Sequence, residues 1–365
     1  MNRVQIVMIG GFLGAGKSTT IRRLARGYLD QGKRVGVLTN DQAPDLVDTL
    51  SLRAQGFLVE EVASACFCCK FNDLIAKVSL LDDIHGADII LVEPVGSCTD
   101  LVSTVILPLR KLYGDRFDIA PYPVLFKATH GLRILDANSR FSPKASYVFR
   151  KQLEEADLIV INRIDEIAAA ELAQLVSALD QHFPGTPVLQ MSAMTGQGFG
   201  AFTAALAQRG GFGRKILDID YDVYAEGEAE LGWLNATICI NASEKFDLDT
   251  LLLQIIGRIR DDLIPLEVEI AHLKVTAVDG TSIGVANVVA TDLKPELSVR
   301  SQCKSATAQV VINARVAVDP ETLRRIVCDR VISVCQWATI SPRFISVQNF
   351  RPGRPIPTHR YSAAD

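Results

Sequence analysis

The chain has 365 residues, more than one hydrophobic core usually supports, so two domains are expected. Hydrophobic residues make up 48% of the chain and charged residues 22%, which excludes an intrinsically disordered composition. The formal net charge of −4 provides no general basic field, so we expect no nucleic-acid partner.

The apolar run at residues 4–10 is too short to span a bilayer and leads directly into a glycine-rich loop, so we expect neither a signal peptide nor a membrane anchor. The eight cysteines lack the regular spacing of a secreted disulfide framework, and three of them stand together at positions 66, 68 and 69. This distribution favours a reducing compartment and a thiolate site. We therefore predict a cytoplasmic protein without a membrane partner.

Short β-rich runs alternate with helical patterns over the first two hundred residues. Five such runs are Val4–Ile9, Val35–Leu38, Ile89–Val92, Leu158–Ile161 and Val188–Met191. Runs that are apolar on both faces suit a mostly parallel sheet with helices on each side, in which the loops at the carboxyl ends of the strands lie together. We predict an α/β domain over residues 1–207.

A glycine-rich loop follows the first run and opens a helical pattern. From Gly11 to Ser18 the spacing is Gly-x-x-x-x-Gly-Lys-Ser, which is typical of a phosphate-binding P-loop. Its backbone N–H groups and the positive end of the next helix attract phosphate, Lys17 is expected at the β and γ phosphates, and Ser18 at Mg²⁺. The predicted nucleotide-binding residues are Gly11, Gly14, Ala15, Gly16, Lys17, Ser18 and Thr19.

Two acidic residues at strand ends are predicted to act beside the phosphates. Asp41 follows the run that begins at Val35 and is a candidate for positioning the attacking water, with Asp45 and Asp48 as weaker alternatives. Glu93 ends the run from Ile89 and is a candidate for holding Mg²⁺ or its water. Three residues later, Gly96 occupies the place expected of a γ-phosphate-sensing glycine.

Three thiols within four residues form the second motif, Cys66-Phe67-Cys68-Cys69. A short loop with three thiolates can bind a soft or borderline metal and leave a fourth position open. Zn²⁺ is the first candidate, and Co²⁺, Fe²⁺ and Ni²⁺ are alternatives. The competing interpretation is that the three are small buried apolar residues. Core packing is the default for the scattered remainder, Cys98, Cys239, Cys303, Cys328 and Cys335, of which Cys98 is near Glu93.

Base recognition is predicted after the fourth run. Asn162-Arg163-Ile164-Asp165 stands where guanine-selective GTPases carry Asn-Lys-x-Asp, and the Asp165 carboxylate can pair with N1 and the exocyclic amine of guanine but would repel the N1 acceptor of adenine. Ser192 and Ala193, after the fifth run, are similar to a further guanine-contacting loop. An ordinary capped turn is the alternative for that pair.

The composition becomes polar and glycine-rich near residue 208, so residues 208–232 are predicted to be a linker. Residues 233–350 contain a weak internal repeat, Ile238 to Leu251 and Val310 to Leu323, which predicts a smaller α+β domain of the split βαβ type. Asp247 and Asp319 are expected to cap its two helices. Residues 351–365 are expected to form an extended tail.

Together these motifs resemble those of the CobW-type GTPases, metal chaperones related to the nickel-insertion GTPases of hydrogenase and urease maturation. The matching motifs are Gly11-x-x-x-x-Gly16-Lys17-Ser18, Cys66-x-Cys68-Cys69, Glu93-x-x-Gly96 and Asn162-x-x-Asp165. The resemblance implies a P-loop GTPase domain followed by a smaller αβ domain, with switch segments joining the thiolates to the nucleotide. The chain departs from the family pattern at Ala65, usually glycine, at Arg163, usually lysine, and at Thr39–Gln42, where Asn-Glu-Phe-Gly is usual.

The expected function is that of a metallochaperone GTPase with slow intrinsic turnover, using GTP/GDP and Mg²⁺ to deliver Zn²⁺ to a client metalloenzyme or cofactor-pathway protein. A nucleotide-dependent homodimer is implied by analogy with the family. Two alternatives remain: a P-loop small-molecule kinase, and a non-metal regulatory GTPase that acts as a chaperone of a cofactor enzyme.

Overall fold

The computed structural model of the chain describes residues 3–41, 52, 56–63, 65–135, 142–280 and 282–362. Its residues divide into two compact units. The first unit consists of the residues up to Pro44, Gly56–Gly227 and the segment from Arg354 onward. The second unit contains Glu228–Gly353. Each unit is described by itself.

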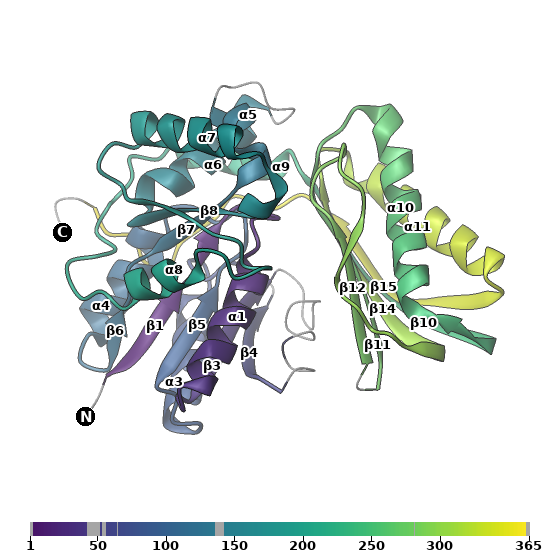
Figure 1. Cartoon of the computed structure of the whole chain (residues 1–365), viewed down its shortest axis with the longest axis horizontal. Coiled ribbons are helices and arrows are strands. Elements are labelled where there is room, and N and C mark those ends of the chain that lie inside the picture. Colours follow the sequence, from purple (N-terminus) through teal and green to yellow (C-terminus); the bar gives the residue numbers. More distant parts are fainter. Residues whose placement is uncertain are drawn as a thin grey trace. The chain divides into compact units, whose positions relative to one another are not determined.

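The first unit is built on parallel strands (Figure 1). Its strands are β1 (Val4–Met8), β2 (Gly10–Gly11), β3 (Val35–Asp41), β4 (Leu58–Ala63), β5 (Ile89–Glu93), β6 (Phe117–Ile119), β7 (Pro123–Lys127), β8 (Leu158–Asn162) and β9 (Val188–Gln190). They form two sheets in the orders β4-β3-β5-β1-β6 and β2-β7-β8-β9, and every pairing is parallel. This confirms the mostly parallel sheet that the sequence predicts.

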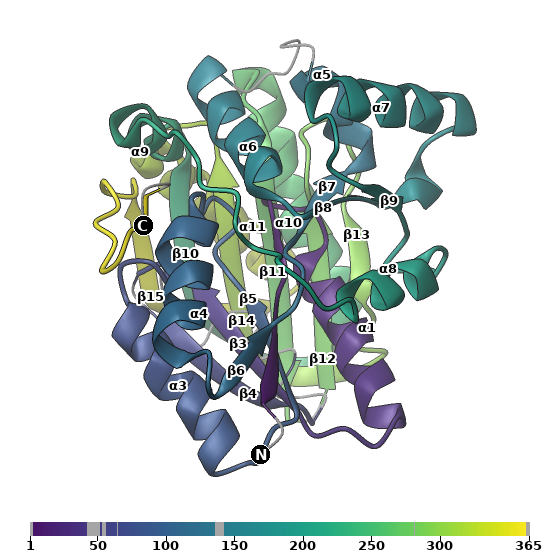
Figure 2. The ribbon, with the colours of Figure 1, turned by 90° about the vertical axis from the view of Figure 1, so that its left-hand side faces the viewer.

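Helices cover both sides of these strands: Figure 2 shows α1 and α8 on one side, and α3 and α4 on the other. The α-helices are α1 (Lys17–Asp30), α3 (Phe71–Asp83), α4 (Leu107–Tyr113), α5 (Gly131–Leu135), α6 (Pro143–Glu155), α7 (Ala169–His182), α8 (Phe199–Leu206) and α9 (Tyr221–Ala229). Shorter turns are η1 (Val102–Ile106, π-helical), η2 (Ala128–His130) and η3 (Ile164–Glu166). Helix α9 lies within the range that the sequence predicts to be a linker.

The second unit is an antiparallel sheet with two helices. Its elements are β10 (Gly232–Asp247), α10 (Leu248–Leu263), η4 (Ile264–Leu266), β11 (Ile270–Asp279), β12 (Ser282–Val288), β13 (Glu296–Val299), β14 (Lys304–Val316), α11 (Pro320–Trp337) and β15 (Ile340–Phe350). The strand order β13-β12-β11-β14-β10-β15 places β14 between β10 and β11. Strand β14, which belongs to the second repeat, therefore lies between the two strands of the first repeat, as the predicted split βαβ arrangement requires.

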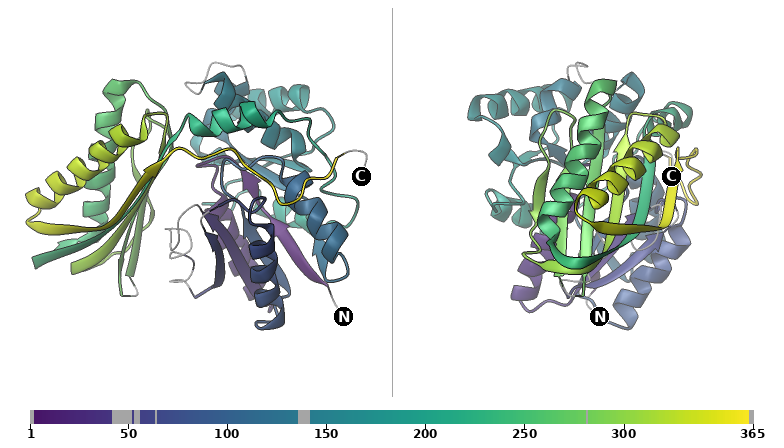
Figure 3. Two further views of the ribbon diagram at one scale, coloured as in Figure 1. Left: turned by 180° about the vertical axis from the view of Figure 1, so that it is seen from behind. Right: turned by 90° about the vertical axis from the view of Figure 1, so that its right-hand side faces the viewer.

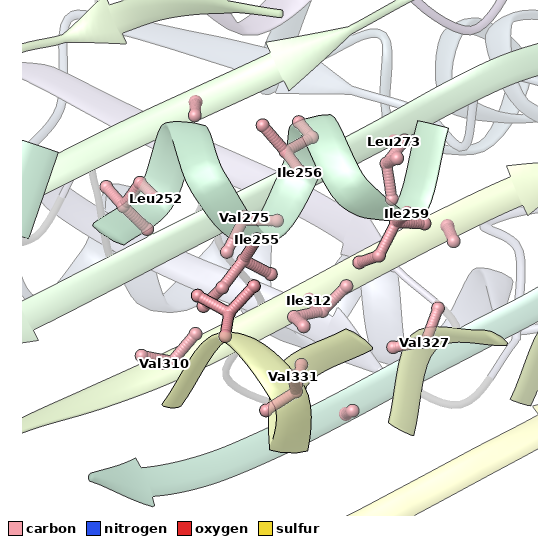
Figure 4. Close-up of a cluster of buried hydrophobic side chains, with 14 of the residues drawn as sticks. Leu252, Ile255, Ile256, Ile259, Leu273, Val275, Val310, Ile312, Val327 and Val331 are labelled. Carbon is pink, nitrogen blue, oxygen red and sulfur yellow. The ribbon is translucent and has the colours of Figure 1, made fainter. Parts of the chain in front are cut away.

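The core of the second unit forms where the apolar faces of α10 and α11 meet the sheet. Ile255, Ile256 and Ile259 of α10 are fully buried and point among Val275 and Ile312 of the strands (Figure 4). The carboxylates of Asp247 and Asp319 accept hydrogen bonds from backbone N–H groups in the first turns of α10 and α11, which confirms the predicted caps. Within the described part of the chain, no helix combines the length and the hydropathy that a membrane crossing needs.

Candidate nucleotide and metal site

The P-loop connects β2 to α1. Gly14 and Gly16 have φ angles of 74° and 92°, in the left-handed region that glycine adopts without strain. A Cβ atom on Gly16 would stand 2.4 Å from Nδ2 of Asn162, so glycine is also required there for close packing. Thr19 lies in the first turn of α1, whose amino-terminal end offers backbone N–H groups to an anion.

Three of the predicted phosphate and Mg²⁺ residues lie together at the start of α1 and the end of β5. The Ser18 hydroxyl donates a hydrogen bond of 2.9 Å to Oε1 of Glu93. The buried Lys17 ammonium donates to the carbonyls of Gly11 at 2.9 Å and Phe12 at 3.3 Å. Because a hydroxyl and a carboxylate are oxygen ligands of the kind that Mg²⁺ takes, Ser18 and Glu93 fit this ion. Their roles toward nucleotide stay predictions.

Gly96 lies next to the same lysine, since a Cβ atom there would be 3.0 Å from Nζ of Lys17. Its carbonyl accepts a hydrogen bond of 3.0 Å from Nε2 of Gln152, a buried residue of α6 that also donates to the carbonyl of Cys98 at 2.9 Å. The loop after β5 is thereby held over the P-loop lysine. No local pattern marks Gln152, because the residues that it contacts are 54 and 56 positions away in the chain.

Asn162 connects the P-loop to the second predicted base loop. Its Nδ2 donates to the carbonyl of Ala15 at 2.8 Å, and its Oδ1 accepts from the N–H of Ala193 at 2.9 Å. The Ser192 hydroxyl accepts from the N–H of Thr195 at 3.1 Å and so caps a turn, while a contact of Ser192 and Ala193 with guanine stays a prediction. Asp165 is exposed on η3.

Arg23 of α1 is a positioning residue that the sequence did not single out. Its guanidinium donates to the carbonyls of Ala193 at 2.7 Å and Met194 at 2.6 Å, and it lies 5.5 Å from the ring centre of Phe199. It therefore fixes the 192–194 loop against the helix that follows the P-loop. No local pattern identifies it, because the carbonyls are about 170 residues away.

The three clustered cysteines converge on one point. The Sγ atom of Cys66 lies 2.9 Å from that of Cys68 and 3.2 Å from that of Cys69, and the last two are 3.8 Å apart. Around a tetrahedral Zn²⁺ with Zn–S bonds of about 2.3 Å, sulfur atoms stand about 3.8 Å apart. A small opening of the loop would therefore place all three sulfurs at ligating distance, whereas residues used only for packing would not need to meet at their sulfur atoms.

The three thiols of this cluster differ in the direction of their pKa shifts. Hydrogen bonding with Cys68, and then with Cys69 and Cys98, holds the pKa of Cys66 well below that of an ordinary thiol. The hydrogen bond to Cys66 raises the pKa of Cys68 and of Cys69. Cys66 is thus the residue that ionises first, and a metal ion must displace protons from the other two. Cys98, expected by default to be core, is buried beside this cluster.

Asn40, near the end of β3, holds the cysteine loop in place. Its Nδ2 donates to the carbonyls of Val62 at 2.8 Å and Ala65 at 2.7 Å, and its Oδ1 accepts from the N–H of Phe67 at 2.9 Å. Both amide N–H groups and the amide oxygen are thus used on the end of β4 and the cysteine loop that follows it. The sequence placed Asn40 in a switch segment but gave it no role, because its partners follow more than twenty residues later.

The remaining predicted carboxylates are less well placed by the structure. Asp41 ends β3, and its side chain lies outside the described part. Asp45 and Asp48 lie outside the described residues. Which of the three is the switch carboxylate therefore stays a prediction.

Comparison with known proteins was made on both sequence and structure. The model of the family "CobW/HypB/UreG, nucleotide-binding domain" matches residues 5–190. Two curated relatives, both zinc chaperones CobW, are 28% identical over 191 residues (Sinorhizobium sp) and 26% identical over 213 residues (Pseudomonas aeruginosa). These alignments cover 47% and 50% of this chain and 53% and 54% of the relatives, so the chain spans about half the length of the curated relatives it matches.

The matches among solved structures include two metal-bound proteins. The Zn(II)-bound YjiA GTPase from E. coli matches with 13% identity and a TM-score of 0.39, covering 90% of this chain and 99% of that one. HypB from Helicobacter pylori in complex with nickel matches with 15% identity and a TM-score of 0.41, covering 57% of this chain and 93% of that one.

Proposed function

Because the chain belongs to the family of CobW/HypB/UreG nucleotide-binding domains, we propose that it is a GTP-hydrolysing metallochaperone. It binds a transition metal, Zn²⁺ before Co²⁺, Fe²⁺ or Ni²⁺, at Cys66, Cys68 and Cys69, and delivers it to a client protein in a nucleotide-dependent way. The cytoplasm, where thiols stay reduced, is the compartment that suits this site. The observation that carries the proposal is a continuous connection between the thiolates and the nucleotide residues.

The first connection runs along β3. Asn40 holds the cysteine loop, and the residue before it, Thr39, is paired with Glu93 in the register of β3 and β5. Glu93 in turn accepts the hydrogen bond of Ser18. A change in how Ser18 and Glu93 hold Mg²⁺ would therefore reach the thiolates through one strand pair and one amide side chain.

The second connection is the turn after β5. Gly96 lies against the Lys17 ammonium, and Cys98, only two residues later, lies against Cys66. The turn is short because the N–H of Cys98 donates to the carbonyl of Val95 at 3.0 Å. A displacement of Gly96 by a γ-phosphate would be transmitted to the thiolate cluster over a few ångströms, as a switch requires.

Nucleotide hydrolysis at this site depends on electrostatic stabilisation of the transition state. Lys17 stabilises the charge that develops on the transferring phosphoryl group, and the P-loop N–H groups orient it. Ser18 and Glu93 would hold Mg²⁺, which would supply further positive charge there. Asp41 or Glu93 positions the attacking water, and intrinsic turnover is slow.

Transfer of the metal uses the incomplete ligand set. Three thiolates leave one tetrahedral position of the metal open, and a side chain of the client can occupy it before the protein's own sulfurs dissociate. The client is a metalloenzyme or a cofactor-pathway protein. Nucleotide-dependent pairing of two chains would give hydrolysis a second way to release the client.

The decisive experiment is a competition for Zn²⁺ between the reduced protein and a zinc-sensitive chromophore, in the apo state and with Mg²⁺ plus GDP or a non-hydrolysable GTP analogue. We expect tighter metal binding with the GTP analogue than with GDP, and linkage then requires that metal favours GTP to the same degree. Equal affinities in all states would overturn the proposed coupling and favour the regulatory GTPase. ATP preference without metal affinity would favour the small-molecule kinase.

A further inference from the structure

The segment Arg354–Tyr361, here called the strap, belongs to the first unit although it follows β15 in the chain. It has no regular secondary structure and is part of the yellow trace that crosses the first unit in the left-hand view of Figure 3. Its side chains are mostly exposed or half-buried, so packing alone does not account for its position. Its hydrogen bonds account for this position.

One end of the strap is bound to the cysteine loop. The N–H of Thr358 donates to the carbonyl of Cys68 at 2.8 Å, and the Thr358 hydroxyl donates to the carbonyl of Cys69 at 3.2 Å. The N–H of Ile356 donates to the Sγ atom of Cys69 at 3.3 Å. The strap therefore contacts both the backbone and a sulfur atom of the candidate metal ligands.

The other end of the strap is anchored at a buried carboxylate. Nε of Arg360 donates to Oδ2 of Asp100 at 2.8 Å, and the Tyr221 hydroxyl donates to the same oxygen at 2.9 Å. The Asp100 side chain is only 1% exposed, so without the guanidinium a buried charge would lose its counter-ion. This gives a free-energy reason for the strap to stay in place.

A second anchor adjoins the first. The N–H of Tyr361 donates to the carbonyl of Ser103 at 3.1 Å, and the Ser103 hydroxyl donates back to the carbonyl of Tyr361. The Lys111 ammonium lies 4.2 Å from the centre of the Tyr361 ring. With both anchors made, the Ile356 N–H is held at the sulfur of Cys69.

We propose that the strap is a working part of the metal site: it orients Cys68 and Cys69, and its Ile356 N–H stabilises the Cys69 thiolate in the metal-bound form. An N–H donor to a ligating sulfur lowers the free energy of the thiolate and fixes its direction, and the loss of such outer partners typically weakens metal binding by about 10- to 100-fold. This inference rests on the proposed function, because it concerns the same three thiolates.

The position of Ile356 allows a sharp test. Its side chain is 77% exposed, so Ile356→Ala removes little packing and keeps the N–H. Ile356→Pro removes the N–H that reaches Cys69. A chain truncated before Arg354 removes the whole strap and serves as the second variant.

The measurement is the Zn²⁺ affinity of each reduced protein by chromophore competition, together with the rate of Zn²⁺ release to a chelator. We expect about 10-fold weaker binding and faster release for Ile356→Pro, a loss of up to about 100-fold for the truncated chain, and wild-type values for Ile356→Ala. Metal-free GTP turnover, which uses none of the strap, reports whether each variant is folded.

The outcomes separate the two proposals. If the wild-type thiolates bind no Zn²⁺, the proposed function fails. If the wild type binds Zn²⁺, and both Ile356→Pro and the folded truncated chain bind and release it as the wild type does, the function stands and the role of the strap is overturned. Equal weakening by Ile356→Ala and Ile356→Pro would also overturn it, because the N–H would then not be the cause.

Discussion

The two units of the chain use their buried polar groups differently. In the first unit, Lys17 is buried at the start of α1, and Asn40 and Glu93 are buried at or near the ends of parallel strands. Their hydrogen bonds involve the P-loop, the start of α1, and β4 with the cysteine loop, next to the predicted ligand sites. In the second unit, the guanidinium of Arg315 donates to Oδ1 of Asn235 at 2.9 Å and stands 3.9 Å from the ring centre of Trp233, so this guanidinium is held by side chains of its own sheet. The first arrangement keeps polar groups available for chemistry, and the second fixes the fold.

This difference predicts that substitutions in the first unit change binding and turnover, whereas substitutions in the second change stability. The largest effect is expected for Lys17→Ala. Removing a preorganised charge that acts in the transition state typically lowers turnover by about 100- to 1000-fold. GTP hydrolysis by the purified protein measures this, with Lys33→Ala, an exposed residue just after α1, as the matched control. Turnover within tenfold of the wild type would remove Lys17 from the mechanism.

The loss of one metal ligand should have an effect nearly as large, and this effect should be confined to metal binding. Cys68→Ala should weaken Zn²⁺ binding by more than the roughly 100-fold that outer partners account for, and should leave GTP affinity largely intact. Cys239→Ala, in β10 of the second unit, is the control thiol. Unchanged Zn²⁺ affinity in Cys68→Ala would show that the metal-site assignment is wrong.

The unequal sharing of protons predicts how metal affinity depends on pH. The pKa values of Cys68 and Cys69 are raised by hydrogen bonding to Cys66, so these two thiols must lose protons when metal binds. The pKa of Cys66 is lowered, so we expect this thiol to be ionised beforehand. Apparent affinity should therefore rise with pH by about 100-fold per unit, below the raised pKa values, because two protons are released. Competition titrations from about pH 6 to pH 8 measure the slope. A slope of three protons would contradict the ionised state of Cys66.

Asn40→Ala tests whether the metal loop depends on β3. The substitution removes two hydrogen bonds to the loop and one to β4, which precedes it. Zn²⁺ affinity should therefore fall by about tenfold or more, and the difference between GTP-analogue and GDP states should shrink. The same competition assay measures both. If affinity falls but the nucleotide effect persists in full, the turn from Gly96 to Cys98 carries the coupling instead.

The fold could be predicted from sequence where the cause of structure is local. Fully apolar runs such as β5 and β8 predicted buried parallel strands, and Asp247 and Asp319 predicted helix caps. Strand β4 gives no such signal, because it lies at the edge of the sheet and carries Glu60 and Glu61 in place of a continuous apolar run.

The site could be predicted only in part, for the same reason. The P-loop and the Cys66–Cys69 motif are contiguous, and their spacing alone indicates their chemistry. The contacts that position them are not contiguous: Arg23 reaches carbonyls about 170 residues away, and the Ile356 N–H reaches a sulfur 287 residues away. No local pattern marks such residues, because only the folded chain brings them to the motif.

The smallest effect is expected in the core of the second unit. Ile255 of α10 is fully buried against the sheet. The substitution Ile255→Val should lower the unfolding free energy by about 0.5–1.5 kcal/mol, because one methylene and its contacts are lost. Both tryptophans of the chain, Trp233 and Trp337, lie in this unit, so urea unfolding followed by tryptophan fluorescence reports on it directly. Ile21→Val, at a fully buried position of α1, is the matched change in the first unit and should leave that transition unmoved. GTP turnover and Zn²⁺ affinity of Ile255→Val should equal those of the wild type; a clear loss of either would mean that the second unit takes part in the chemistry and that the contrast between the two units is only one of packing.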